Sequence, residues 1–143
     1  MTFEELGLKE DILSAIAELG FEQAMPVQER SIPFMMSDTR DLVALAQTGT
    51  GKTAAFGLPI LQLIQAERKQ TQALVLAPTR ELCIQIANDM KNYSKYLKGV
   101  KVVPVYGGEN IITQLRQLDI PPQILVATPG RLIDLMERRK VNL

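Results

Sequence analysis

Residues 46–53 constrain this chain more than any other segment. They read Ala-Gln-Thr-Gly-Thr-Gly-Lys-Thr, after the apolar run of residues 42–45 and before a stretch with helix-like composition. A glycine loop between a strand and a helix turns so tightly that backbone N–H groups point at one oxyanion, and the helix adds its positive N-terminal end. Lys52 would reach the β- and γ-phosphates of a nucleotide, and the Thr53 hydroxyl would ligate Mg²⁺. The segment therefore predicts a nucleotide-binding loop.

One position departs from the strict form of this loop, which has glycine where this chain has Ala46. Alanine does not adopt left-handed backbone angles cheaply, so we expect the loop to open slightly differently. The alternative is a chance Gly/Thr loop ahead of a helix. The strand and helix expected on either side favour nucleotide binding.

Composition excludes several classes of site. The chain has 143 residues, no histidine, one cysteine and no net charge. This length fits one domain or part of one. The lack of histidine excludes a Ser/His triad and argues against a zinc site, and the lone Cys83 excludes an intrachain disulfide, as is typical of a reducing cytosol. Zero net charge weighs mildly against a polyanion partner, so any nucleic-acid contact would come from a few placed groups.

Localisation follows from what the sequence lacks. No apolar run is long enough to span a bilayer, and residues 1–5 have neither the basic nor the apolar region of a signal peptide. We expect a cytoplasmic protein without a membrane partner.

Helical and β-branched segments alternate along the chain. Helices are expected over residues 8–19, 26–36, 52–67, 80–97, 110–118 and 131–139, and strands over residues 42–46, 73–77, 100–106 and 124–127. This alternation predicts an α/β fold with a parallel sheet, whose ligands bind at the carboxyl ends of the strands. A distinctive motif follows each predicted strand, so we expect all four motifs at this edge.

Two of these strand ends place an arginine at the start of a helix. In residues 78–81 (Pro-Thr-Arg-Glu), a capping role explains Thr79 and the helix dipole explains Glu81, but neither explains the cation of Arg80. Arg131 likewise places a cation at the expected start of a helix, directly after Thr-Pro-Gly. Together they predict a phosphate-binding track apart from the nucleotide loop. Gly107-Gly108 is either a simple turn or a place where a polymer backbone passes closely.

Taken together, these motifs resemble the DEAD-box RNA helicase family over the whole chain. Residues 20–28 (Gly-Phe-Glu-Gln-Ala-Met-Pro-Val-Gln) look like the family's Q motif, with Phe3 as its isolated upstream aromatic. The nucleotide loop has the family's form, Ala46 included. Residues 78–85 match motif Ia, residues 107–108 match the GG motif, and residues 128–131 match motif Ib.

The resemblance implies a RecA-like P-loop NTPase fold of the α/β class, a parallel sheet flanked by helices and truncated before the Asp-Glu-Ala-Asp strand. Residues 1–38 would form the Q-motif region and residues 39–143 the P-loop core of a partial first domain, with the second RecA-like domain absent. ATP and Mg²⁺ would be the cofactors and RNA the partner. The Gln28 amide would read the adenine edge, Phe21 would stack near the base, and RNA contacts to the sugar-phosphate backbone would not depend on sequence.

The predicted site residues fall into two groups. The nucleotide group comprises Phe3, Phe21, Gln28, Ala46, Gln47, Thr48, Gly49, Thr50, Gly51, Lys52 and Thr53, with Lys52 and Thr53 in the catalytic role and Thr53 as metal ligand. The RNA group comprises Pro78, Thr79, Arg80, Glu81, Gly107, Gly108, Thr128, Pro129, Gly130 and Arg131.

Two departures from the family pattern have consequences. The Q motif normally has Pro at Ala24 and Ser or Thr at Met25, so a hydroxyl contact to the loop or helix start is missing. The sequence also ends at Leu143, before the acidic motif, the Ser-Ala-Thr motif and the arginine fingers. Because phosphoryl transfer needs these parts, we expect this polypeptide alone to hydrolyse ATP negligibly and not to unwind RNA. Residues 42–46 would be partly unpaired, which favours marginal stability or self-association.

Two other readings remain. A different P-loop NTPase, such as a GTPase or small-molecule kinase, would leave motifs Ia and Ib without a role, and no Asn/Thr-Lys-x-Asp guanine reader occurs. A non-catalytic module that binds nucleotide or partners by mimicking the helicase domain is the third possibility.

Overall fold

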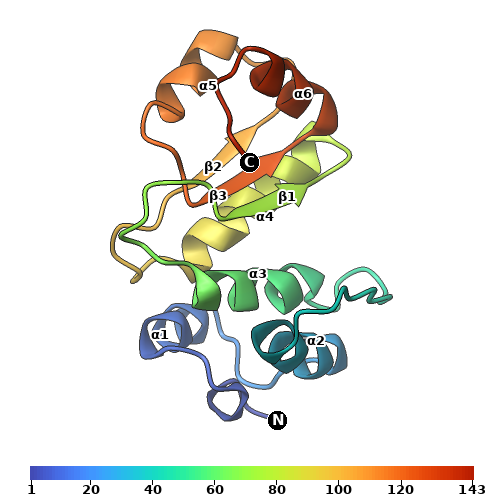
Figure 1. Cartoon of the computed structure of the whole chain (residues 1–143). Coiled ribbons are helices and arrows are strands. Elements are labelled where there is room, and N and C mark those ends of the chain that lie inside the picture. Colours follow the sequence, from blue (N-terminus) through green and yellow to red (C-terminus); the bar gives the residue numbers. More distant parts are fainter. The chain divides into compact units, whose positions relative to one another are not determined.

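The computed structural model describes residues 1–143 and divides into two compact units (Figure 1). Unit 1 consists of Met1–Leu63 and Asn92–Lys98, and unit 2 of Ile64–Lys91 and Gly99–Leu143. No helix of the chain combines the length and the apolar composition that crossing a bilayer requires.

Unit 1 is helical. A short 3-10 helix, η1 (Glu4–Leu6), precedes α1 (Glu10–Glu18), α2 (Pro26–Ser37) and α3 (Lys52–Leu63). Apolar residues at helical spacing bury one face of α1, whereas α2 buries the polar Gln28 and Ser31 beside Ile32. α3 packs against both helices and is buried over most of its length. The fully buried side chains of this core are Ile12, Ile16, Ile32, Leu58 and Leu61. This core holds the start of α2 close to the start of α3.

The prediction of a strand over residues 42–46 is wrong. These residues have no strand conformation, and the side chains of Leu42, Val43 and Leu45 are 42%, 86% and 94% exposed. A β-strand exists only through hydrogen bonds to a neighbouring strand, and unit 1 contains just one isolated bridge, between Thr2 and Gln23. The apolar run had the right composition but finds no partner in its unit.

Unit 2 holds a three-stranded parallel sheet. Its strands are β1 (Ala73–Leu76), β2 (Val102–Val105) and β3 (Ile124–Ala127), in the order β1-β3-β2. Every residue of the central strand β3 is fully buried, as expected for a parallel sheet covered by helices. The connecting helices are α4 (Arg80–Tyr93), α5 (Ile111–Gln117) and α6 (Pro129–Glu137). The predicted parallel α/β architecture is confirmed.

The strand register aligns three carboxyl ends. Leu76 of β1 and Val105 of β2 both pair with Ala127, the last residue of β3. The motifs that follow these three strands therefore leave the sheet at one edge, as the sequence predicted for them. The fourth motif, the glycine loop, follows no strand of this sheet. Helix ends differ from prediction: α3 ends at Leu63 rather than 67, and α6 begins at Pro129 rather than 131. Proline suits the first helical position, and periodicity alone does not locate helix ends.

Candidate functional site

The glycine loop of unit 1 has the left-handed glycines and the following helix that the sequence predicts, but no strand precedes it. Gly49 and Gly51 have φ of 77° and 75°, the left-handed region that favours glycine, and α3 begins directly afterwards at Lys52. The Lys52 ammonium donates a hydrogen bond to the Ala46 carbonyl at 2.7 Å, and the Thr50 hydroxyl donates to the Gln47 carbonyl at 2.6 Å. The loop thus folds back on itself, and the Lys52 ammonium is hydrogen-bonded to a backbone carbonyl of the same loop.

Gln28 connects the Q-motif segment to this loop. Its side chain is 3% exposed in the first turn of α2, and its amide nitrogen donates to the Gly51 carbonyl at 3.1 Å. The amide oxygen accepts the Met25 backbone N–H at 2.9 Å. A Cβ on Gly51 would lie 2.2 Å from the Gln28 amide nitrogen, so a side chain there would displace the Gln28 amide from the Gly51 carbonyl. Each end of the amide keeps one unused hydrogen-bonding position, because an amide offers two donors and two acceptor lone pairs.

α2 starts without the hydroxyl expected at Met25, because the Gln28 backbone N–H that such a hydroxyl would have accepted donates to the Met25 carbonyl at 2.8 Å. The Met25 backbone N–H is satisfied by the Gln28 side chain, which is the reciprocal half of a capping box. Pro26 occupies the first helical position, where a missing N–H costs nothing.

Two predicted aromatic residues pack together in unit 1. The ring of Phe3 is 3% exposed and lies 5.8 Å, centroid to centroid, from the half-buried ring of Phe21. Phe21 in turn lies 6.0 Å from Tyr93. Burial assigns Phe3 a packing role beneath Phe21, and its contact with a nucleotide stays a prediction.

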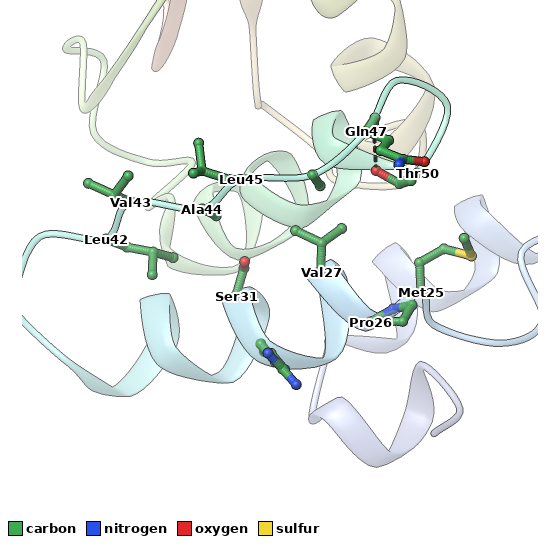
Figure 2. Close-up of a pocket in the computed structure, with 12 residues that line it drawn as sticks. Met25, Pro26, Val27, Ser31, Leu42, Val43, Ala44, Leu45, Gln47 and Thr50 are labelled. Carbon is green, nitrogen blue, oxygen red and sulfur yellow. Dashed lines mark hydrogen bonds between the residues drawn. The ribbon is translucent and has the colours of Figure 1, made fainter.

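A pocket of about 510 Å³ lies between the start of α2 and residues 42–47 (Figure 2). Val27 and Ser31 point from α2 toward the exposed apolar segment, and Gln47 and Thr50 bring the glycine loop to one end of it. Gln28 and Lys52 do not line this pocket. Its walls are mostly apolar, and the loop residues Ala46, Gln47 and Thr50 form only one end of the pocket.

In unit 2, Arg80 leaves the carboxyl end of β1 as the first residue of α4. Its guanidinium lies 5.1 Å from the centroid of the Tyr106 ring and 3.5 Å from the Gly108 carbonyl. A Cβ on Gly108, which has φ of 80°, would come within 3.1 Å of this guanidinium. The Thr79 hydroxyl caps α4 by accepting the Leu82 N–H at 3.2 Å, as predicted. The glycine doublet therefore lets the loop after β2 approach Arg80.

Arg131 reaches the same loop from the first turn of α6. It donates two N–H groups to the Glu109 carbonyl, at 3.3 and 3.2 Å, and one to the Gln114 side-chain oxygen at 3.0 Å. The Gln114 side chain is 2% exposed and donates onward to the Tyr106 carbonyl at 2.9 Å. The two predicted arginines thus converge on residues 106–109.

Sequence reasoning missed two members of this site, Glu109 and Gln114. Glu109 directly follows the glycine doublet, so its position beside the predicted phosphate-binding residues could have been recognised from the sequence. Gln114 gave none, because one glutamine within a short helix is indistinguishable from a solvated one until tertiary structure buries it.

The remaining predicted RNA residues lie around these arginines at the same edge of the sheet. They are exposed, apart from the half-buried Thr128, and comprise Pro78, Thr79, Glu81, Gly107, Gly108, Thr128, Pro129 and Gly130. The predicted loop residues Gln47, Thr48, Gly49 and Lys52 are exposed in unit 1.

The chain has no group of three or more His, Cys, Asp or Glu side chains placed to hold a metal ion. A Mg²⁺ ion prefers oxygen ligands and usually keeps several waters and substrate phosphates. An ion held mainly by nucleotide phosphates and waters would need few protein ligands, and the role of Thr53 as one of them stays a prediction.

A glycine loop that opens a helix, together with a parallel sheet whose ligand-facing ends carry two arginines, defines a nucleotide-binding α/β domain of the P-loop class. The sequence profile of the DEAD/DEAH box helicase family matches residues 25–143, so the chain belongs to this family.

Relatives agree with this assignment. The chain is 51% identical to the ATP-dependent RNA helicase DeaD of Escherichia coli K12 and 44% identical to the DEAD-box ATP-dependent RNA helicase CshA of Geobacillus kaustophilus. Both matches cover 99% of this chain, but 22% and 30% of the relatives.

Solved structures confirm the RecA-like fold. A DEAD box protein from Methanococcus jannaschii aligns with a TM-score of 0.92 at 40% identity, covering 100% of this chain and 39% of that protein. Saccharomyces cerevisiae Dbp5 bound to RNA and ADP-BeF3 aligns with a TM-score of 0.89 at 34% identity, covering 99% of this chain and 35% of that one.

Proposed function

We propose that this chain is the ATP- and RNA-binding portion of a DEAD-box RNA helicase, which couples ATP hydrolysis to local unwinding of RNA duplexes. The observation that carries the proposal is the hydrogen bond from Gln28 to Gly51, because it ties the predicted base reader to the loop that would hold the phosphates. The solved relative Dbp5 with RNA and ADP-BeF3 supports both ligands.

On the nucleotide side, the unused N–H and lone pair of the Gln28 amide offer one donor and one acceptor to the adenine edge. Lys52 would exchange the Ala46 carbonyl for a phosphate oxygen, which as an anion is the stronger acceptor. The N-terminus of α3 favours the same charge, and Thr53 would complete the Mg²⁺ shell. Phe21, supported by Phe3, would lie near the base.

On the RNA side, Arg80 and Arg131 would contact the phosphates of one strand. Contacts to the sugar-phosphate backbone read shape rather than sequence. Two converging arginines and exposed helix N-termini would supply positive charge locally. RNA binding is therefore compatible with a net charge of zero.

We infer that residues 1–38 act as the Q-motif region and 39–143 as the P-loop core, in a cytoplasmic protein. Residues 1–143 contain no Asp-Glu-Ala-Asp, so this polypeptide alone would hydrolyse ATP negligibly. The exposed side chains of Leu42, Val43 and Leu45 would drive self-association, since each offers apolar surface to a second copy.

The test is a titration of ATP, ADP and GTP into the wild-type chain, Gln28→Ala and Gln28→Glu. Adenine reading predicts that the wild type prefers ATP to GTP and that both variants lose this preference. Loss of ATP and GTP affinity by the same factor would instead show that Gln28 only positions the loop. Absence of all nucleotide binding would overturn the nucleotide half of the proposal.

The RNA half is tested separately by anisotropy with a labelled uridine oligonucleotide. Arg80→Ala and Arg131→Ala should each weaken binding, and the effect should be similar for other base compositions. Unchanged binding in both variants would place any RNA site elsewhere.

A further inference from the structure

Glu109 stands between the two arginines of the proposed RNA site. Its carboxylate lies 3.9 Å from the Arg80 guanidinium, while its backbone carbonyl accepts both N–H groups of Arg131 at 3.2 and 3.3 Å. Arg131 therefore fixes the main chain of Glu109, and the side chain is left to face Arg80. One residue contacts both cations that would meet RNA phosphates.

Arg80 does not depend on this carboxylate for its position. The Tyr106 ring lies under its guanidinium at 5.1 Å, and the Gly108 carbonyl is 3.5 Å from one of its nitrogens. The ion pair itself is solvent-exposed, with side-chain exposures of 46% for Arg80 and 39% for Glu109, so it contributes little to folding. Its main consequence is electrostatic, because an acid occupies a cationic binding edge.

We propose that Glu109 is an affinity-setting residue of the RNA site: its carboxylate competes with RNA phosphate for Arg80 and repels the incoming backbone. The inference rests on the proposed RNA-binding function. Both effects act in one direction, since a phosphate that engages Arg80 must displace the carboxylate and then remain near a like charge. For charges a few ångströms apart in water, removing this repulsion raises affinity roughly three- to fivefold.

The decisive experiment measures binding of a labelled uridine oligonucleotide to the chain by anisotropy, between about 50 and 200 mM salt. The variants are Glu109→Gln, Arg80→Ala and their combination. Glu137→Gln is the matched control, because it removes the same charge from an exposed residue at the opposite end of α6 from Arg131.

We expect Glu109→Gln to bind about three- to fivefold more tightly than the wild type at the lowest salt. Its plot of log affinity against log salt should be steeper by up to about 0.7, one additional neutralised phosphate. Glu137→Gln should bind like the wild type. In the Arg80→Ala background, Glu109→Gln should give a smaller gain, because the competition for Arg80 is gone and only the repulsion between Glu109 and the RNA backbone remains. Tighter binding cannot result from a damaged fold, so this readout separates the proposal from a structural role.

Several outcomes would overturn it. Equal or weaker binding by Glu109→Gln, with Arg80→Ala still impaired, would leave the RNA site standing and remove the role of Glu109. A full gain in the Arg80→Ala background, or an equal gain in Glu137→Gln, would show general charge repulsion rather than competition at Arg80. Absence of binding in every variant would overturn the RNA site and this inference together.

Discussion

The Gln28 amide nitrogen and the Gly51 carbonyl lie 3.1 Å apart, so that one hydrogen bond joins the first turn of α2 to the end of the glycine loop. Gln28 is buried, and its oxygen accepts the Met25 N–H, which holds the amide in a single orientation. The segment proposed to read the base and the loop proposed to hold the phosphates are therefore one connected unit.

Gly51→Ala should be much more destabilising than Gly49→Ala. Both glycines have nearly the same positive φ, so both substitutions carry about 1 kcal/mol of backbone strain. Only the Cβ at Gly51 meets a neighbour, the Gln28 amide at 2.2 Å, whereas nothing lies within 4 Å of a Cβ at Gly49. Denaturant unfolding should show about 1 kcal/mol or more of additional loss for Gly51→Ala. Equal losses of unfolding free energy in the two variants would contradict the predicted clash. Combining each glycine variant with Gln28→Ala should bring the two losses closer together.

Gln114→Leu should weaken both the fold and the RNA site. It leaves the Tyr106 carbonyl without its donor and removes one acceptor from Arg131, for a loss of about 1–3 kcal/mol in unfolding free energy. Uridine oligonucleotide affinity should fall several-fold, because Arg131 is no longer fixed. Gln117→Leu, at an exposed position of the same helix, is the control and should leave both measurements near wild type. Normal RNA affinity in Gln114→Leu would deny it a positioning role.

Val43→Ser and Leu45→Ser together should reduce self-association. These side chains are 86% and 94% exposed in a segment without strand partners. Sedimentation velocity over a concentration series should show oligomers for the wild type and fewer for the double variant. Leu63→Ser, which changes a 56% exposed residue at the end of α3, should leave the distribution unchanged. A wild type that stays monomeric at all concentrations would argue against association through residues 42–46.

Cys83 should lower stability at alkaline pH. Burial raises the pKa of its thiol, and the S–H donates to the Val126 carbonyl at 3.4 Å. Because the folded thiol holds its proton more tightly than the unfolded one, its contribution is complete below the unfolded pKa of about 8.5 and is lost as the pH rises through the higher folded value. The stability difference between wild type and Cys83→Ala should therefore shrink from pH 7 to about pH 10 in urea unfolding. A difference independent of pH would contradict the raised pKa.

The 143-residue polypeptide should show no RNA-stimulated ATP turnover. Lys52 and Thr53 can hold phosphates and Mg²⁺, but phosphoryl transfer also needs groups that position water and stabilise the transition-state charge. A steady-state phosphate-release assay with and without RNA checks this, with Lys52→Ala as the background control. RNA-stimulated ATP turnover above that of Lys52→Ala would contradict the expectation.

Sequence reasoning located most of the fold. β-branched runs separated by helical segments predicted the parallel sheet, and the residues that follow β1, β2 and β3 were correctly placed at one edge. It failed at residues 42–46, because composition measures how well a segment suits a strand but not whether a partner strand is present.

The sequence by itself determined the glycine loop, the positions of Arg80 and Arg131 at helix starts, and the family. These features depend on local backbone preferences and on spacing, which are written in neighbouring residues. Only the tertiary structure decided that Gln28 bonds to Gly51, that Gln114 is buried beneath Arg131, and that Glu109 faces Arg80. The physical reason is that a polar side chain has the same local preferences whether solvated or buried, and its partner is chosen only when packing removes water from it.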